Sequence, residues 1–392
     1  MTPAARVQTA IELLDKVIAS ARAKGAPADR ILAEWFKNNR FAGSKDRRAI
    51  RELVYSAIRA CGPVPANGRA AMLRLARVDP AIATLFDGSN YGPEPIAEGE
   101  EPAQGGVAPL WLEQALGASG VESEEAEALL GRAPLDLRIN TLKADRATLS
   151  LPVEAEPTAA PHGLRLPSGT PVEQWPDYRE GRIEVQDTGS QLACLAAEAK
   201  PGEMVVDLCA GGGGKTLALA AAMDNLGRII ASDTDRSRLS RLMPRAERAG
   251  ATNIETRLLD PGKELDALAD LAGHADAVLI DAPCSGTGTW RRNPEARWRL
   301  DEKELERLTA IQSRLLDIAA KLLRPGGRLV YVTCSLLDAE GTDQFDAFLS
   351  RHTGFAARTP SLPLGRPRGQ GIRLSPKADD TDGFFIACAE RA

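Results

Sequence analysis

The sequence lacks the features that mark several protein classes. Its 392 residues include only 3 histidines and 6 cysteines, and no two cysteines form a C-x-x-C pair, so no metal site is predicted. No apolar run approaches the ~18 residues of a membrane span, and the start MTPAARVQTAIELLDKV has no signal-peptide pattern. We therefore expect a cytoplasmic protein without a membrane partner, in which the thiols stay reduced.

An excess of positive charge is also missing. The formal net charge is −5, so no overall field draws the chain onto nucleic acid, and any such site must be a local basic patch. The hydrophobic share of 43% and the charged share of 26% are ordinary for a globular protein. The length allows two or three domains.

The chain reads as three regions. Residues 1–130 have helical spacing of apolar residues, as in Ile11, Leu14 and Ile18. Residues 131–185 predict a small α+β module, because the strand-like LDLRINTLKA, GLRLPSG and GRIEVQD are separated by Pro/Gly turns. From 186 to 392 strands and helices alternate, which predicts an α/β domain with a mainly parallel sheet. Its expected strands are 204–209, 228–233, 253–260, 277–284, 328–335 and 383–389, and a long helix is expected within 300–323.

The stretch VVDLCAGGGGKTLALAA, from Val205, predicts a strand, a glycine turn and a helix that hold a polar ligand. A phosphate-binding P-loop would need glycine where Cys209 stands, and a dinucleotide turn would need glycine where Thr216 stands. A P-loop-like nucleotide hydrolase stays an alternative, since AVLID (277–281) could end in a magnesium-binding Asp. The candidate cofactor residues of this turn are Cys209, Ala210, Gly211, Gly212, Gly213, Gly214 and Lys215.

Three predicted strands end in carboxylates, Asp233, Asp260 and Asp281. In a wound parallel sheet these ends meet at one edge, and the acid after the second strand typically binds a ribose hydroxyl. Such an edge repels a triphosphate and favours a ligand with a ribose, an adenine amine and a positive sulfonium. The sequence therefore predicts S-adenosylmethionine as the cofactor.

Two cysteines follow neighbouring strands, Cys284 in DAPCSGTG and Cys334 in YVTCS. A lone cysteine is usually a buried apolar residue, but two at matching strand ends favour a catalytic function. A thiolate that adds to carbon 6 of a pyrimidine makes carbon 5 able to attack a sulfonium methyl group. Asp281, if protonated, could donate to ring nitrogen 3.

Together DAPCSGTG with RRNPEARW, YVTCS, the glycine turn and DGFF (382–385) resemble the Sun family of RNA 5-methylcytosine methyltransferases, within it the bacterial ribosomal RNA small-subunit methyltransferase B group. RINTLK (138–143) resembles that family's small RNA-recognition-like module, and the first region a shortened NusB-like domain. The resemblance implies a Rossmann-like class I methyltransferase domain over 186–392 that acts on RNA, with ribosomal RNA as the expected substrate.

The resemblance also implies roles. The TCS cysteine, here Cys334, is the nucleophile, and Cys284 assists product release, while the turn and the three aspartates contact the cofactor. From the residues alone either cysteine could attack. The turn departs from the family pattern CAAPGGKT, since this chain has CAGGGGKT, and the extra glycine reduces loop rigidity.

Arginines and tryptophans follow the first cysteine motif, a composition that suits phosphate contact and base stacking on unpaired RNA. The candidate RNA-binding residues are Trp290, Arg291, Arg292, Arg297 and Trp298. Weaker basic candidates lie at 45–51 and 365–377. A non-catalytic RNA-binding assembly factor remains a further alternative. Oligomeric state has no sequence signal, and a monomer is the default expectation.

Overall fold

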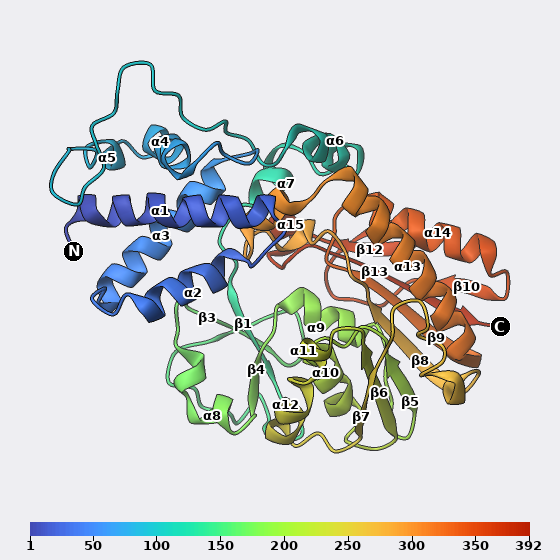
Figure 1. Cartoon of the computed structure of the whole chain (residues 1–392). Helices are drawn as coiled ribbons and strands as arrows, with labels where there is room; N and C mark the ends of the chain where they lie inside the picture. The colour runs from blue at the N-terminus through green and yellow to red at the C-terminus, as the bar shows by residue number, and fades with distance from the viewer. The chain divides into compact units, whose positions relative to one another are not determined.

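The computed structural model describes residues 1–392, and the chain divides into two units (Figure 1). The first, called the helical unit, comprises residues 1–132 together with 289–302. The second, called the sheet unit, comprises residues 133–288 and 303–392. The three predicted domain ranges, 1–130, 131–185 and 186–392, stay predictions.

The predicted helical character of the first region is confirmed. The helices are α1 (Pro3–Arg22), α2 (Ala28–Asn38), α3 (Ser44–Ala60), α4 (Gly68–Val78), α5 (Pro80–Ala83), α6 (Leu110–Ala118) and α7 (Ser123–Ala128). Helix α1 begins at Pro3, and the Thr2 hydroxyl accepts a hydrogen bond of 3.1 Å from the N–H of Ala5, which caps the helix. Its face with Leu14 and Ile18 is buried against α3 and α4.

A small antiparallel sheet opens the sheet unit. Its strands, in the order β2-β3-β1-β4, are β1 (Leu135–Ile139), β2 (Glu156–Pro157), β3 (Gly163–Leu166) and β4 (Ile183–Val185). The short helix α8 (Pro176–Arg179) precedes β4. Leu137, Ile139, Leu166 and Ile183 form a core of their own. The predicted small α+β module is therefore present with its expected strands.

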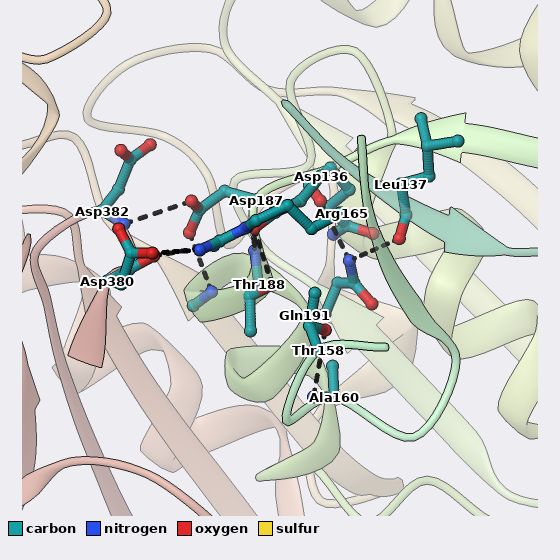
Figure 2. Close-up of polar contacts among 12 residues, drawn as sticks. Asp136, Leu137, Thr158, Ala160, Arg165, Asp187, Thr188, Gln191, Asp380 and Asp382 are labelled. Carbon is teal, nitrogen blue, oxygen red and sulfur yellow. Dashed lines mark hydrogen bonds and ion pairs between the residues drawn. The ribbon is translucent and has the colours of Figure 1, made fainter. Parts of the chain in front are cut away.

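Figure 2 shows how this small sheet is fastened within the sheet unit. Asp136 on β1 is only 1% exposed, and its Oδ1 accepts a hydrogen bond of 2.7 Å from Nε of Arg165 on β3. Its Oδ2 accepts one of 2.7 Å from the hydroxyl of Thr188, the first residue of helix α9 (Thr188–Leu195). Arg165 also donates to the carbonyl of Asp380, at 2.8 Å. The buried contacts of Asp136 and the exposed contact of Arg165 with Asp380 tie the module to the rest of the sheet unit.

The large sheet has the order β11-β12-β13-β9-β8-β5-β6-β7, with β10 paired to β13. Its strands are β5 (Met204–Asp207), β6 (Arg228–Asp233), β7 (Ile254–Leu258), β8 (Ala275–Asp281), β9 (Leu323–Thr333), β10 (Phe355–Arg358), β11 (Arg366–Arg368), β12 (Gly371–Leu374) and β13 (Phe384–Arg391). Strands β5 to β9 pair in parallel, and β13 is antiparallel to β9. The predicted mainly parallel, Rossmann-like sheet is confirmed, whereas β10, β11 and β12 were not predicted.

Helices cover both faces of this sheet. Ala277 and Leu279 of β8 belong to the core that includes α9, α10 (Gly214–Ala222) and α12 (Leu242–Ala249). Val278 and Ile280 face the opposite core, which includes α13 (Glu302–Leu322) and α14 (Thr342–Arg351). Successive side chains of β8 thus point to opposite cores, as expected for a pleated strand buried on both faces. The remaining short helices are α11 (Arg236–Leu239) and α15 (Pro376–Asp379).

Candidate active site

A cavity of about 530 Å³ opens at the carboxyl ends of the parallel strands in the sheet unit. Five residues predicted from sequence line it together: Cys209, Asp233, Asp281, Cys284 and Cys334. They lie at the ends of β6 and β8 or in the segments after β5, β8 and β9, and these four strands are neighbours. Ligands of open α/β sheets bind at this edge, and the volume suits a small-molecule ligand.

The two thiols predicted to cooperate are adjacent. Sγ of Cys284 lies 3.3 Å from Sγ of Cys334. Strands β8 and β9 pair in parallel, so their ends bring the two cysteine loops to the same place. The hydrogen bond with Cys334, followed by burial, raises the pKa of the Cys284 thiol well above its ordinary value. Cys284 is thereby held as the protonated partner of the pair.

The glycine turn does not line the cavity but binds Asp233, which does. Gly211 and Gly213 have φ of +54° and +85°, the left-handed region that glycine adopts at least cost. The N–H of Gly211 donates a hydrogen bond of 2.7 Å to Oδ2 of Asp233, and the N–H of Asp235 donates one of 2.7 Å to Oδ1. The carboxylate is thus fixed in the wall while retaining lone pairs for a hydroxyl ligand.

Lys215, the first residue after the four glycines, is held by a carboxylate. Its Nζ lies 2.6 Å from Oδ2 of Asp281. Burial opposes the charged ammonium, but Asp281 and the thiols of Cys194 and Cys334 together raise the pKa of Lys215. A P-loop lysine must reach phosphates, so this ion pair gives the nucleotide-hydrolase alternative no support.

A second carboxyl group lies beneath the turn. Asp207 ends β5 with no exposure, and its Oδ2 accepts a hydrogen bond of 2.7 Å from the hydroxyl of Thr216 on α10. Burial is the main cause that raises the pKa of Asp207 to about 7. Sequence analysis passed over this residue, which lies inside the predicted strand 204–209 but ends the observed strand β5.

Other predicted cofactor residues do not line the cavity. Asp260 is exposed, and its neighbours Leu259 and Pro261 line the wall instead, because β7 ends at Leu258. The expectation that Asp260 lies at the cavity is therefore not met. Ala210, Gly211, Gly212, Gly213, Gly214 and Lys215 also stand outside the lining set.

Sequence analysis missed five charged lining residues: Asp235, Arg238, Glu264, Arg307 and Arg314. Arg238 comes from α11, Arg314 from α13, and Glu264 from the segment after β7. Glu264 is 3% exposed and accepts a hydrogen bond of 2.7 Å from Nη2 of Arg314. None follows a strand directly, so the strand-end rule that identified the other residues could not reveal them.

The predicted RNA-binding run is largely buried, which is a correction. Trp290 and Arg297 have no exposure, Trp298 is 4% exposed and Arg291 5%. Within the helical unit Arg297 donates to the carbonyl of Ile58 at 2.7 Å, and Trp298 Nε1 donates to that of Gly62 at 3.0 Å. Buried side chains cannot contact RNA, so direct contact is wrong for Trp290, Arg291, Arg297 and Trp298. Arg292 is half-buried.

Comparisons with known proteins identify the family of the chain. The family model described as 16S rRNA methyltransferase RsmB/F matches residues 194–389. A ribosomal RNA small subunit methyltransferase B of Xylella fastidiosa (strain 9a5c) is 38% identical over 288 residues, 71% of this chain and 67% of the relative. Other curated relatives of the same name are matched over as little as 59% of their length.

Solved structures share the fold. The crystal structure of PH0851 has a TM-score of 0.77 and 26% sequence identity, over 100% of this chain and 99% of that chain. A methyltransferase homolog protein from Pyrococcus horikoshii has a TM-score of 0.60 and 27% identity, over 72% of this chain and 99% of that chain. No helix here has both the length and the apolar character needed to cross a bilayer.

Proposed function

The chain belongs to the RsmB/F family of 16S rRNA methyltransferases, and we propose that it forms 5-methylcytosine in ribosomal RNA with Cys334 as nucleophile and Cys284 as the releasing thiol. The observation that carries this proposal is the 3.3 Å separation of the two sulfur atoms, in the wall of the cavity that Asp233 and Asp281 also line. Neither the hydrolase nor the non-catalytic alternative accounts for paired thiols at this edge.

The residues present fit S-adenosylmethionine, the methyl donor of this family. Asp233 is fixed where it can accept hydrogen bonds from ribose hydroxyls. Asp281, which lines the cavity and pairs with Lys215, adds a carboxylate suited to a sulfonium. When bound, this cofactor supplies an electrophilic methyl group.

The thiol pair accounts for the steps on the base. The Cys334 thiolate adds to carbon 6 of cytosine, and the electron pair released onto carbon 5 takes the methyl group. Transfer of the carbon 5 proton to solvent water then restores the ring, breaks the bond between sulfur and carbon 6, and expels Cys334 as a thiolate. Cys284, held protonated 3.3 Å away, is placed to return a proton to the departing sulfur.

Replacement of the nucleophile tests the proposal most directly. We expect Cys334→Ala to lower methyl transfer to ribosomal RNA by at least about 10³-fold, because it removes the thiol that we propose bonds to carbon 6. Calorimetry should show unchanged S-adenosylmethionine binding. Cys388→Ala is the matched control, since this buried thiol on β13 lies outside the cavity. Full activity of Cys334→Ala would remove Cys334 from the mechanism.

Replacement of the second thiol separates the two roles. We expect Cys284→Ala to form the Cys334 adduct but release it slowly, so an RNA-linked protein band should accumulate on a denaturing gel. The band should be absent in the Cys284→Ala/Cys334→Ala double variant. A Cys284→Ala protein that turns over at the normal rate without such a band contradicts the releasing role.

We also propose that the chain acts as a monomer in the cytoplasm. All the residues that line the cavity come from one chain, and its six cysteines are free thiols, as expected in a reducing compartment. Light scattering at working concentration and cell fractionation test these two statements separately. A stable dimer, or a protein confined to the periplasm, would contradict them.

A further inference from the structure

A fully buried carboxylate lies beside the cysteine loops and has no cationic partner. Glu340 belongs to the 3-10 turn Asp338–Glu340 that follows β9, and its exposure is 0%. Its Oε1 accepts hydrogen bonds from the N–H of Ser285 at 2.8 Å and from Nε2 of Gln312 at 3.0 Å. Its Oε2 accepts one from the hydroxyl of Ser285. All these donors are neutral, and a buried carboxylate is retained only when such bonds satisfy it.

A chain of hydroxyl groups runs from this carboxylate between the two loops. Oγ of Ser285 lies 3.2 Å from Oγ of Ser335, which lies 3.1 Å from Oγ1 of Thr287. Thr287 accepts a hydrogen bond of 2.8 Å from the N–H of Leu336. Ser285 uses its hydroxyl proton to donate to Glu340, so Ser335 donates to Ser285 and Thr287 donates to Ser335. The carboxylate therefore sets the direction of the whole chain.

The positions of these residues relate the chain to the thiols. Ser285 directly follows Cys284, and Ser335 directly follows Cys334. Strand pairing fixes Cys334, which comes immediately after β9, but Cys284 lies three residues beyond the end of β8 at Asp281. The Cys284 loop therefore needs an anchor other than the sheet. Glu340 supplies one, and its own backbone is fixed because the Tyr331 hydroxyl of β9 donates to its carbonyl at 2.7 Å.

We infer that Glu340 is a positioning residue for methyl transfer: as the final acceptor of the hydroxyl chain, it holds the loop of Cys284 against the loop of Cys334. The inference rests on the proposed function for its catalytic consequence, but the geometric claim concerns the thiol pair itself. Misplacement of reacting groups by about 1 Å lowers rates by about 10²-fold. Loss of the anchor therefore acts on the rate of transfer and not on cofactor affinity.

The test uses a probe that requires two close thiols. Phenylarsine oxide forms arsenic–sulfur bonds to both cysteines with loss of one water, so its affinity reports their separation. In Glu340→Met, which keeps the volume but removes both acceptors, we expect arsenical affinity to fall at least about 10-fold. We expect kcat to fall about 10²-fold, while the Kd for S-adenosylmethionine stays within about threefold. Glu340→Gln keeps one acceptor oxygen and should lie between Glu340→Met and the natural protein in both measurements.

Glu203→Met is the matched control. Glu203 also accepts a backbone hydrogen bond, from Lys200, and it pairs with Arg328 at the opposite end of the strands. It should leave arsenical affinity and kcat unchanged. Natural arsenical affinity and kcat in Glu340→Met overturn the inference. If Glu340→Met does not fold, Glu340→Gln decides: unchanged arsenical affinity with retained cofactor binding overturns it equally. A natural protein that binds the arsenical but methylates no RNA contradicts the proposed function alone.

Discussion

Two consecutive stretches of the chain, 281–288 and 289–302, were both expected at the active site, and only the first lies there. Asp281 and Cys284 line the cavity of the sheet unit. The second stretch belongs to the helical unit, where Arg297 and Trp298 are buried. Strand-end positions follow from backbone topology, whereas a composition rich in arginine and tryptophan suits either RNA or a protein interior.

Replacement of Arg297 tests whether the second stretch has a structural role in the helical unit. Arg297 donates to the carbonyls of Ile58 and Cys61, 239 and 236 residues earlier, so Arg297→Met removes two buried hydrogen bonds. We expect the free energy of unfolding of the helical unit to fall by about 3 kcal/mol, measured by urea denaturation. Arg48→Met, at an exposed site, should change it by less than about 0.5 kcal/mol.

The same variant tests RNA contact directly. If Arg297 touched a phosphate, its loss would reduce the slope of log affinity against log salt by about 0.7 for single-stranded RNA. We expect an unchanged slope for folded protein at low temperature. A reduced slope with unchanged stability would restore the sequence-based expectation.

The pH dependence of the free energy of unfolding tests the buried carboxyl group of Asp207 at the end of β5. Burial raises the pKa of Asp207 in the folded protein to about 7, from 3.8. Between these values the folded state binds more protons than the unfolded state, so this group's stabilising contribution declines as pH rises from about 4 to 7. We expect Asp207→Asn to gain about 2 kcal/mol relative to the natural protein between pH 5 and pH 8. Parallel urea curves for the two proteins would contradict the raised pKa.

The smallest expected effect concerns the departure in the glycine turn. The N–H of Gly212 donates no hydrogen bond, and the nearest atom to an added Cβ, Nη1 of Arg245, lies at an ordinary 3.5 Å. Gly212→Pro should therefore raise the free energy of unfolding by about 0.5 kcal/mol, because proline lowers the conformational entropy of the unfolded chain. Gly213→Ala is the contrasting variant, because a Cβ there would lie 2.6 Å from Cγ of Leu242 at a φ of +85°. Destabilisation by Gly212→Pro would show that this turn requires glycine at 212.

The sequence was sufficient to locate the features whose positions follow from a parallel sheet. The strands β5, β6, β8 and β9, the turn between β5 and α10, and both cysteines could be located because apolar runs and motifs mark strand ends. Glu340, Glu264 and Arg314 could not, since their burial and partners depend on how distant segments pack. Strands β11 and β12 escaped prediction because they are short, and Arg366 and Arg373 interrupt their apolar pattern. Arg373 is nonetheless buried, with its Nη2 2.7 Å from Oδ1 of Asp338.

Because residues 289–302 belong to the helical unit, the polypeptide passes between the units at 132/133, 288/289 and 302/303. An expression clone that starts at residue 133 would keep 289–302 but discard its packing partners, leaving the indole of Trp298 and the guanidinium of Arg297 to solvent. In such a fragment the loop 289–302 would expose apolar surface, and we expect the fragment to aggregate. The sheet unit therefore cannot be produced alone simply by choosing a start residue. The buried side chains of 289–302 must also be replaced by polar ones.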